Sequence, residues 1–264
     1  MYLDGSISES AMRSSGQSPR GASIKKYRVK LIERREIAQG TMAFDFSRPS
    51  GFVFRGGQAI NVALIHPSAI DEKGSRRTFS IASGPHDPRL TIAMRMRDSA
   101  FKRTLRNLPL GSDVQIDGPT GRFVLEERGL HPAVFIAGGI GITPFMSMIK
   151  EAFQMPSPRP ITLFYSNSSP AAAAFLNDLT AMAYENCFLE VVPTVSAPES
   201  VVLGDWEGER GLIDLAMLSR HVPNLQEAEY YIAGPSGMVS AMETLVTGAG
   251  VARELVHTDR FSGY

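Results

Sequence analysis

A glycine-rich turn at residues 138–141 is the first segment of this sequence whose residue types point to ligand chemistry. It follows the apolar run 133–137 and precedes apolar residues at helical spacing, so it joins a strand to a helix. Glycines there let a cofactor pyrophosphate approach the backbone, and the first N–H groups and the dipole of the helix favour an anion. The turn predicts a dinucleotide site, with a tight turn made of glycine for packing alone as the alternative.

A second segment, Arg77-Thr-Phe-Ser, combines a guanidinium, an aromatic ring and two hydroxyls on one predicted strand. Alternation along a strand places Arg77 and Phe79 on one side, and Thr78 and Ser80 on the other. An ordinary strand with one surface arginine fits the same residues. The segment therefore indicates a site only in combination with the others.

The elements that must position these segments are of two kinds, and the first kind occupies residues 25–117. Short β-rich runs are separated by turn residues such as Gly40, Gly56-Gly57 and Gly84-Pro85. The predicted strands are 27–32, 41–46, 59–65, 77–83, 90–96 and 113–117. About six strands at this spacing, interrupted by one helix at 99–108, suggest a small antiparallel barrel or sandwich.

After residue 121 strands and helices alternate. Strands are predicted at 133–137, 161–165, 189–195 and 230–233, and helical spacing follows, with one helix from about Leu212 and another that starts at Pro235. This order implies a parallel, doubly wound sheet whose ligand lies beyond the carboxyl ends of the strands. We predict a two-domain α+β protein with a disordered tail at 1–23, a six-stranded antiparallel β-barrel at 24–126 and a doubly wound parallel sheet at 127–264.

Composition limits the classes of function. The 264 residues include equal numbers of basic and acidic side chains, 27 each, so no overall charge argues for nucleic acid or an acidic membrane surface, although a local basic patch fits. No apolar run reaches the roughly 20 residues of a membrane helix. Cys187 is the single cysteine, which excludes an intramolecular disulfide and a four-cysteine iron–sulfur cluster on this sequence. We expect a cytoplasmic protein without a metal site, with Cys187 buried as a structural residue.

Five segments, in order, resemble the ferredoxin–NADP reductase family. Arg77-Thr-Phe-Ser is similar to its flavin motif, Gly118-Pro-Thr-Gly to its hinge, and Gly138-Gly-Ile-Gly-Ile-Thr-Pro to its nicotinamide pyrophosphate loop. Ala233-Gly-Pro-Ser-Gly-Met resembles a turn that begins with cysteine in the family, and Asp259-Arg-Phe-Ser-Gly-Tyr its closing acidic segment. The resemblance covers about residues 24–264. It implies FAD in the barrel, NADH or NADPH in the α/β domain, and no iron–sulfur domain.

The resemblance also implies roles for single residues. Arg77 would clamp the FAD pyrophosphate, since a guanidinium fork suits phosphate oxygens. Phe79 would lie against the flavin, and Ser80 would hydrogen-bond flavin N5, with Ser80 and Asp259 as the catalytic residues. The further cofactor-binding residues implied are Thr78, Met94, Arg95, Phe101, Lys102, Gly138, Gly139, Gly141, Thr143, Pro144, Ser166, Asn167, Ala233, Gly234, Met238 and Tyr264. A solvated helix face is the alternative for Lys102 and Arg103, and core packing or exposure for the terminal Tyr264.

The sequence departs from the family pattern at three places. Ala233 replaces the cysteine beside the reacting nicotinamide carbon, which predicts slower or differently oriented transfer, because the cofactors themselves carry the chemistry. Tyr165-Ser-Asn-Ser-Ser-Pro has no basic residue for a 2′-phosphate, which favours NADH. Ser166 and Asn167 can still bond either ribose, and Arg210 can reach in from a neighbouring loop. Asp259 stands where the family often has glutamate, so its carboxylate reaches less far.

These observations predict a flavin-dependent NAD(P)H reductase. Hydride would pass from the nicotinamide to flavin N5, and electrons would go on to a separate ferredoxin, flavodoxin or oxygenase component, or to a small oxidant. One alternative is a flavin-bearing electron-transfer or regulatory subunit in which the Ala233 turn no longer supports nicotinamide binding. Another is a two-domain nucleotide-binding protein without a redox role.

Overall fold

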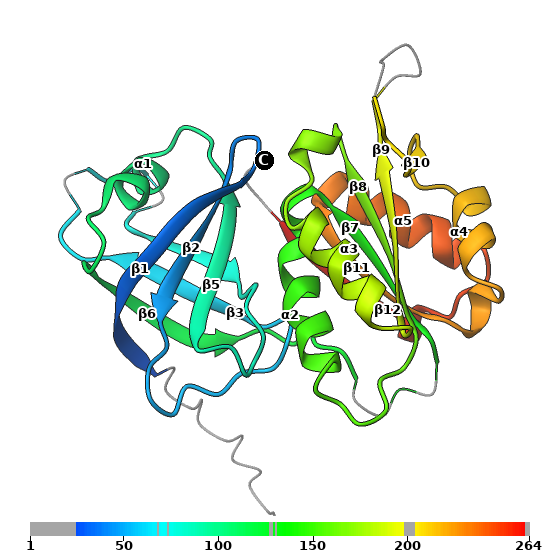
Figure 1. The fold of residues 1–264 in the computed structure, drawn as a ribbon, viewed down its shortest axis with the longest axis horizontal. Coiled ribbons are helices and arrows are strands. Elements are labelled where there is room, and N and C mark those ends of the chain that lie inside the picture. Colours follow the sequence, from blue (N-terminus) through cyan, green and yellow to red (C-terminus); the bar gives the residue numbers. More distant parts are fainter. Residues whose placement is uncertain are drawn as a thin grey trace, which may run out of the picture.

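The computed structural model describes residues 25–67, 69–72, 74–126, 129, 131–197 and 204–261, and the tail predicted at residues 1–23 lies outside them. Two units stand side by side, one from each half of the chain (Figure 1). No helix among these described residues is long and apolar enough to cross a membrane. The prediction of a β unit followed by an α/β unit is confirmed.

The first unit is a six-stranded antiparallel sheet around one apolar core. Across the sheet the order is β4 (Arg76–Ser80), β3 (Ala59–Leu64), β6 (Asp113–Thr120), β1 (Lys26–Ala38), β2 (Thr41–Ser47) and β5 (Arg89–Arg95). Side chains alternate between the two faces of a strand, so Ile60, Val62 and Leu64 of β3 all enter the core. The six predicted strands are therefore all present.

Helix α1 (Ala100–Asn107) covers one end of this core. The Ser99 hydroxyl caps it by accepting a hydrogen bond from the Lys102 N–H at 3.2 Å. Phe101 and Leu105, one turn apart, are buried in the core of the first unit. The start of the helix is thereby held close to β4 and β5.

The second unit is a six-stranded parallel sheet. Its order is β10 (Glu209–Arg210), β9 (Leu189–Val195), β8 (Ile161–Asn167), β7 (Ala133–Gly138), β11 (Glu229–Pro235) and β12 (Val256–Phe261). Every residue of β7 is buried, as its unbroken apolar run predicts for a strand covered on both faces.

Helices cover both faces of the parallel sheet (Figure 1). On one face lie α2 (Ile142–Ala152) and α3 (Leu176–Glu185), and on the other α4 (Leu215–His221) and α5 (Ser236–Gly248). Short 3₁₀ turns connect them at η1 (Gly139–Gly141), η2 (Pro170–Ala172), η3 (Leu225–Glu227) and η4 (Arg253–Leu255). The doubly wound arrangement predicted from the alternating pattern is confirmed.

Helix α2 also packs against the first unit. The Ser147 hydroxyl donates a hydrogen bond to the Ser83 carbonyl at 2.7 Å, and Lys150 forms an ion pair with Asp87 at 2.8 Å. A Cβ at Gly56 would lie only 2.7 Å from the backbone of the helix. The helix that begins at the glycine turn is therefore fixed to the barrel along its side.

Two local predictions were wrong, and one strand was missed. Helix α4 begins at Leu215 and not at Leu212, because the Asp214 carboxylate caps it by accepting the Met217 N–H at 2.7 Å. The edge strand β12 was not predicted as a strand, since most of its side chains are polar. Cys187 is exposed rather than buried.

Candidate functional site

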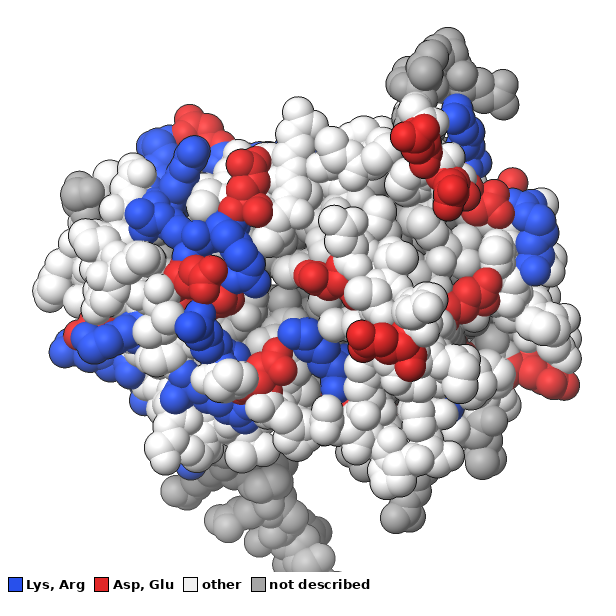
Figure 2. Space-filling view, in the orientation of Figure 1, with Lys and Arg blue, Asp and Glu red and all other residues white. Residues whose placement is uncertain are grey.

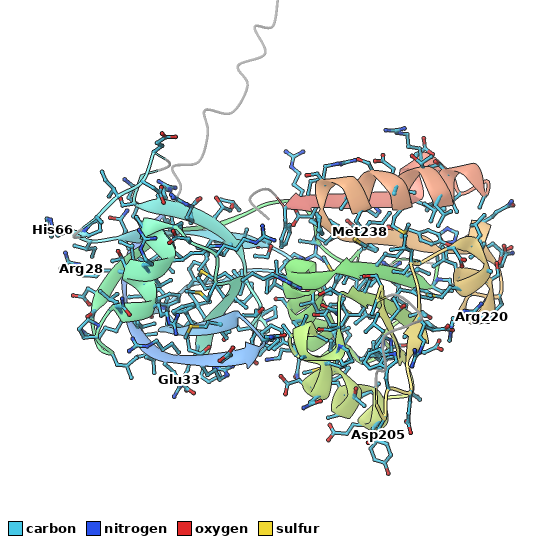
Figure 3. The ribbon with its side chains drawn as sticks, turned by 90° about the horizontal axis from the view of Figure 1, so that it is seen from above. Arg28, Glu33, His66, Asp205, Arg220 and Met238 are labelled. Atoms are coloured by element: carbon cyan, nitrogen blue, oxygen red, sulfur yellow. The ribbon has the colours of Figure 1, made fainter. Side chains whose placement is uncertain are left out.

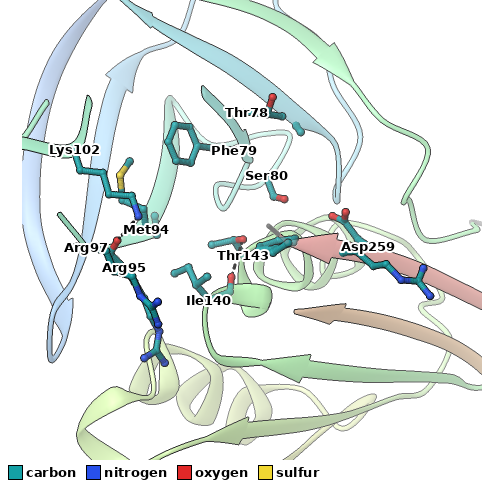
Figure 4. Close-up of a pocket in the computed structure, with 14 residues that line it drawn as sticks. Thr78, Phe79, Ser80, Met94, Arg95, Arg97, Lys102, Ile140, Thr143 and Asp259 are labelled. Carbon is teal, nitrogen blue, oxygen red and sulfur yellow. Dashed lines mark hydrogen bonds between the residues drawn. The ribbon is translucent and has the colours of Figure 1, made fainter. Parts of the chain in front are cut away.

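A pocket of about 260 Å³ lies where the two units meet. Strands β4 and β5 and the start of α1 form one side, and the start of α2 and the end of β12 form the other (Figure 4). Eight predicted site residues line it: Thr78, Phe79, Ser80, Met94, Arg95, Lys102, Thr143 and Asp259. The structure thus brings together residues from distant parts of the chain.

Ser80, at the end of β4, presents a free hydroxyl to this pocket. The residue is only 9% exposed, and its hydroxyl bonds to none of the residues that the structure describes. It points from the barrel toward Thr143 and Asp259 (Figure 4). With no partner among the described residues, this hydroxyl is available to a ligand in the pocket.

Phe79 gives the barrel side of the pocket an apolar wall. Its ring packs on the ring of Phe101, with 5.8 Å between centroids, and Met94 beside it is 3% exposed. Phe101 does not line the pocket but supports Phe79 from behind. A flat aromatic ligand would find a matching surface here.

Arg77 lies away from the pocket. Its guanidinium forms an ion pair with Asp71, donates to the Gly74 carbonyl at 2.8 Å and stands 5.3 Å over the ring of Phe101. Arg77 and Phe79 both contact the ring of Phe101, so these two side chains lie on the same side of β4, as the alternation predicts. A phosphate at Arg77 would have to share the guanidinium with Asp71.

Positive side chains surround the pocket. Arg95, Arg97, Lys102 and Arg260 line it, and among the described lining residues only Asp259 carries a carboxylate. The Lys102 ammonium donates to the Arg95 carbonyl at 2.7 Å, which holds it at the rim. This excess of positive charge fits a ligand that carries phosphate.

The glycine turn packs tightly against β11 and the start of α5. A Cβ at Gly138 would overlap the Met238 sulfur, and one at Gly141 would overlap the Ala233 carbonyl oxygen. Gly139 has a φ of +53°, and a Cβ there would lie 3.0 Å from the Arg95 guanidinium. Packing therefore requires glycine at Gly141, where the obstacles are backbone atoms, whereas the nearest obstacle at Gly138 is the flexible Met238 side chain and Gly139 faces a cation from the other unit.

Other predicted residues lie around this turn. Gly234, with a φ of +151°, stands against the Gly138 backbone, since a Cβ there would be 3.1 Å from the Gly138 nitrogen. Thr143 donates to the Ile140 carbonyl at 3.0 Å, and Pro144 is buried in the first turn of α2, where a missing N–H costs no helix hydrogen bond.

Ser166 and Asn167 end strand β8 at the edge of the sheet where the glycine turn also lies. Ser166 pairs with Gly138, whereas Asn167 pairs with Val195 of β9, which pairs in turn with Arg210 of β10. The Asn167 side-chain oxygen is buried without a hydrogen-bond partner among the described residues. Arg210 is exposed, two strands away from Asn167.

Asp259 reaches the pocket from β12, directly opposite Ala233 of β11. Burial raises the pKa of its carboxyl above the ordinary aspartate value. Ala233 itself is fully buried beside the glycine turn. Tyr264 lies outside the described residues.

Six lining residues were not selected from the sequence: Ala59, Ala93, Arg97, Ile140, Arg260 and Phe261. Signals existed for four of them. Ile140 lies within the glycine turn, Arg260 and Phe261 within the closing segment, and Arg97 two residues after Arg95. Ala59 and Ala93 carry no chemical signal, and only the packing of the strands places them here.

Known proteins similar to this chain are oxidoreductases. The model of the oxidoreductase NAD-binding domain matches residues 135–244. The chain is 29% identical over 228 residues to the glycine betaine monooxygenase reductase subunit of Pseudomonas aeruginosa, covering 84% of this chain and 60% of that protein. It is 26% identical over 250 residues to ferredoxin–NADP reductase B of Sorangium cellulosum, covering 89% and 97%. The chain thus spans 60% of the length of the first of these relatives.

Solved structures share the fold. The FAD/NAD-binding domain of nitric oxide dioxygenase from Vibrio cholerae superposes with a TM-score of 0.75 at 18% identity, covering 89% of this chain and 98% of that one. A ferredoxin NADP⁺ reductase from Neisseria gonorrhoeae, solved with FAD and NADP, gives 0.74 at 19% identity, covering 89% and 98%. At these identities the likeness concerns the two-unit fold.

Proposed function

Because this chain belongs to the ferredoxin–NADP reductase-like family of FAD/NAD(P)H oxidoreductases, we propose that it is a reductase that serves a separate electron acceptor. When bound, FAD would accept a hydride from NADH or NADPH at its N5 atom and release electrons to the acceptor. The observation that carries the proposal is the shared pocket, which Ser80 enters from one unit and Asp259 from the other.

The barrel side of the pocket suits FAD. Phe79 and Met94 offer an apolar wall for the flavin ring, and the Ser80 hydroxyl would donate a hydrogen bond to N5. Lys102 and Arg77 would hold the diphosphate, and the five N–H donors of Arg77 allow it to bond phosphate while it keeps Asp71. We place the end of this FAD-binding unit at residue 126, between β6 and β7.

The second unit would hold the nicotinamide dinucleotide at the glycine turn. Its pyrophosphate would lie between the first N–H groups of α2 and the Arg95 guanidinium, which stands beside Gly139. Asp259 would face the reacting rings, where its raised pKa lets it hold a proton more readily than an exposed aspartate does. Ala233 opposite it adds only a methyl.

We propose that NADH is the preferred donor. Ser166 and Asn167, at the end of β8, are neutral and can hydrogen-bond ribose hydroxyls. Arg210 stands two strands away, so it contacts a 2′-phosphate only if its side chain extends across β9. Parallel titrations with NADH and NADPH test this preference, and a lower half-saturating concentration for NADPH would reverse it.

Purification and anaerobic mixing test the function as a whole. The protein should be yellow or become so with added FAD, and NADH should bleach the flavin absorbance rapidly. A chain that cannot be reconstituted with FAD would instead be a nucleotide-binding protein without a redox role. A yellow chain that neither nucleotide bleaches would be an electron-transfer or regulatory subunit.

Replacement of Ser80 tests the flavin side of the pocket. Ser80→Ala should retain FAD, and bleaching by NADH should slow severalfold or more, because one well-placed hydrogen bond to N5 is lost. Stopped-flow absorbance measures the rate. Ser50→Ala, at an exposed turn of the same unit, is the control and should bleach at the wild-type rate. An unchanged rate in Ser80→Ala would remove Ser80 from the mechanism.

The acceptor should be acidic. The charges of this chain cancel in total, but they are distributed unequally between the two units, and the first unit is positive. Residues 24–126 contain 18 Lys or Arg and 10 Asp or Glu, whereas residues 127–264 contain 7 and 15. Figure 2 shows basic side chains gathered over the first unit and acidic ones over the second. The relative named as a monooxygenase reductase subunit supports an oxygenase component or ferredoxin as the acceptor. Attraction to the positive unit would speed its encounter with the flavin.

Charge reversal on α1 tests this docking. Arg103 is exposed beside the pocket residue Lys102 and pairs only with the exposed Asp98 among the described residues. Arg103→Glu should slow electron transfer to a [2Fe–2S] ferredoxin by about tenfold at low ionic strength, and salt should erase the difference. Arg28→Glu, at the outer end of the same unit (Figure 3), is the control and should have a much smaller effect. Equal effects of the two reversals would contradict docking beside α1.

A further inference from the structure

A buried group of charged side chains lies at the amino ends of β11 and β12, away from the pocket. Glu229 is 7% exposed, and one oxygen accepts a hydrogen bond from the Arg159 guanidinium at 2.5 Å. Its other oxygen lies 2.7 Å from His257 Nε2. Burial opposes ionisation of Glu229, but the bonds from His257 and Arg159 outweigh it and lower its pKa to about 2. The carboxylate is therefore a permanent acceptor at neutral pH.

Tyr231 joins this group to the segment between the two units. Its ring stacks on the His257 ring, with centroids 4.6 Å apart and 23° between the planes. Its hydroxyl accepts bonds from Arg159 at 3.1 Å and from the Glu126 N–H at 3.3 Å. Burial raises the pKa of Tyr231 to about 12, so the phenol stays neutral. The Tyr231 ring thus packs against the His257 ring, and the Glu229 carboxylate bonds its Nε2 atom.

His257 belongs to the strand that carries Asp259. Strand β12 is at the edge of the sheet and, within the part of the chain that the structure describes, pairs only with β11. Within that pairing His257 is opposite Tyr231 and Asp259 is opposite Ala233. Residues two apart on a strand point to the same face and are about 7 Å apart. His257 and Asp259 therefore share the face that looks toward α2 and the barrel.

An edge strand has no neighbour on its outer side to fix its register or twist. The bond from His257 to Glu229 and the stack on Tyr231 tie β12 to β11 immediately before Asp259. Beyond Asp259, Arg260 donates to Glu243 of α5 at 2.6 Å. The carboxylate at the pocket therefore lies between two tethers, of which the His257 tether ends on the more deeply buried carboxylate, that of Glu229.

We propose that His257, held by Glu229, is a positioning residue that sets the place of Asp259 at the pocket. This proposal rests on the proposed function, because it assumes that Asp259 faces the reacting cofactors. His257 does not line the pocket and would act through the strand. Loss of its N–H donor would let the end of β12 move and would misplace the carboxylate without touching the pocket itself.

His257→Phe removes the donor while keeping a ring to stack on Tyr231, and His257→Gln keeps a donor without the ring. In stopped-flow bleaching, His257→Phe should lower the limiting rate fivefold or more and change the half-saturating NADH concentration less than twofold. His257→Gln should restore the rate to within twofold of wild type. If His257→Phe does not fold, His257→Leu replaces it. Equal rates in the Phe and Gln variants would overturn the proposal.

Two further measurements separate positioning from a general loss of structure. In the purified chain without nucleotide, amide hydrogen exchange over residues 256–261 should accelerate about tenfold in His257→Phe and stay near wild type in His257→Gln. In an Asp259→Asn background, His257→Phe should slow bleaching no further. Additive slowing, or unchanged exchange, would overturn the proposal. Absence of bleaching in the wild type would instead contradict the proposed function. The exchange measurement alone would then test whether His257 ties β12 to β11.

Discussion

Gly141→Ala should leave FAD bound and slow its reduction by NADH about 100-fold, because a displacement of about 1 Å in bound reactants has that effect. Gly141 has φ −59° and ψ −6°, a conformation that alanine adopts without strain. Its Cβ, however, would overlap the Ala233 carbonyl oxygen and lie 2.7 Å from the Gly234 Cα. Both obstacles are backbone atoms of a buried strand, so the start of α2 must move away from β11.

The matched control for this substitution is Gly237→Ala. Gly237 lies in the first turn of α5, and a Cβ there meets no atom of the described residues within 4 Å. Alanine favours helix over glycine, so this variant should be as active as wild type and slightly more stable. Stopped-flow bleaching and the flavin content of each variant are the measurements. If Gly141→Ala bleached as fast as Gly237→Ala, the glycine turn would have no part in nucleotide binding.

Glu229→Gln should lower the free energy of unfolding at pH 7 by about 3 kcal/mol, the effect expected when one partner of a buried ion pair is removed. The folded-state pKa of Glu229, about 2, lies below that of an exposed glutamate. Its contribution is therefore complete above about pH 5 and is lost as the pH falls toward 2. The stability difference between wild type and variant should shrink over that range.

Denaturant unfolding at several pH values measures this difference. Glu227→Gln, two residues earlier and exposed, is the control and should change the free energy of unfolding by less than about 0.5 kcal/mol at any pH. A difference between wild type and Glu229→Gln that stayed constant from pH 7 to pH 3 would show that ionisation of Glu229 does not stabilise the fold.

Patterns local in the chain predicted most of the fold. The apolar run at 133–137 and the glycines after it predicted β7, the turn and α2, because each depends on neighbours in the sequence. Strand β12 has no such signal. Its His257, Thr258, Asp259 and Arg260 are polar, and they form a strand only because β11 offers a free edge. Prediction failed there because the cause is tertiary.

The candidate site likewise combines features that the sequence predicted with features that depend on tertiary structure. The resemblance of two segments almost 180 residues apart selected Ser80 and Asp259, and the structure places both at one pocket. The ion pair between Arg77 and Asp71 could not be foreseen, because it depends on how a turn folds back beside β4. The lack of space at Gly141 likewise depends on β11, which comes some 90 residues later.

Helix α2 fixes the two units of the molecule to each other. Its first turn belongs to the nucleotide site, and its flank is bonded to the barrel through Ser147 and Lys150. Grafting this nucleotide half onto another flavin half would therefore fail unless the barrel loops that contain Gly56, Ser83 and Asp87 were transplanted with it. The part of this chain that could be exchanged with a related protein as one piece is therefore larger than either unit.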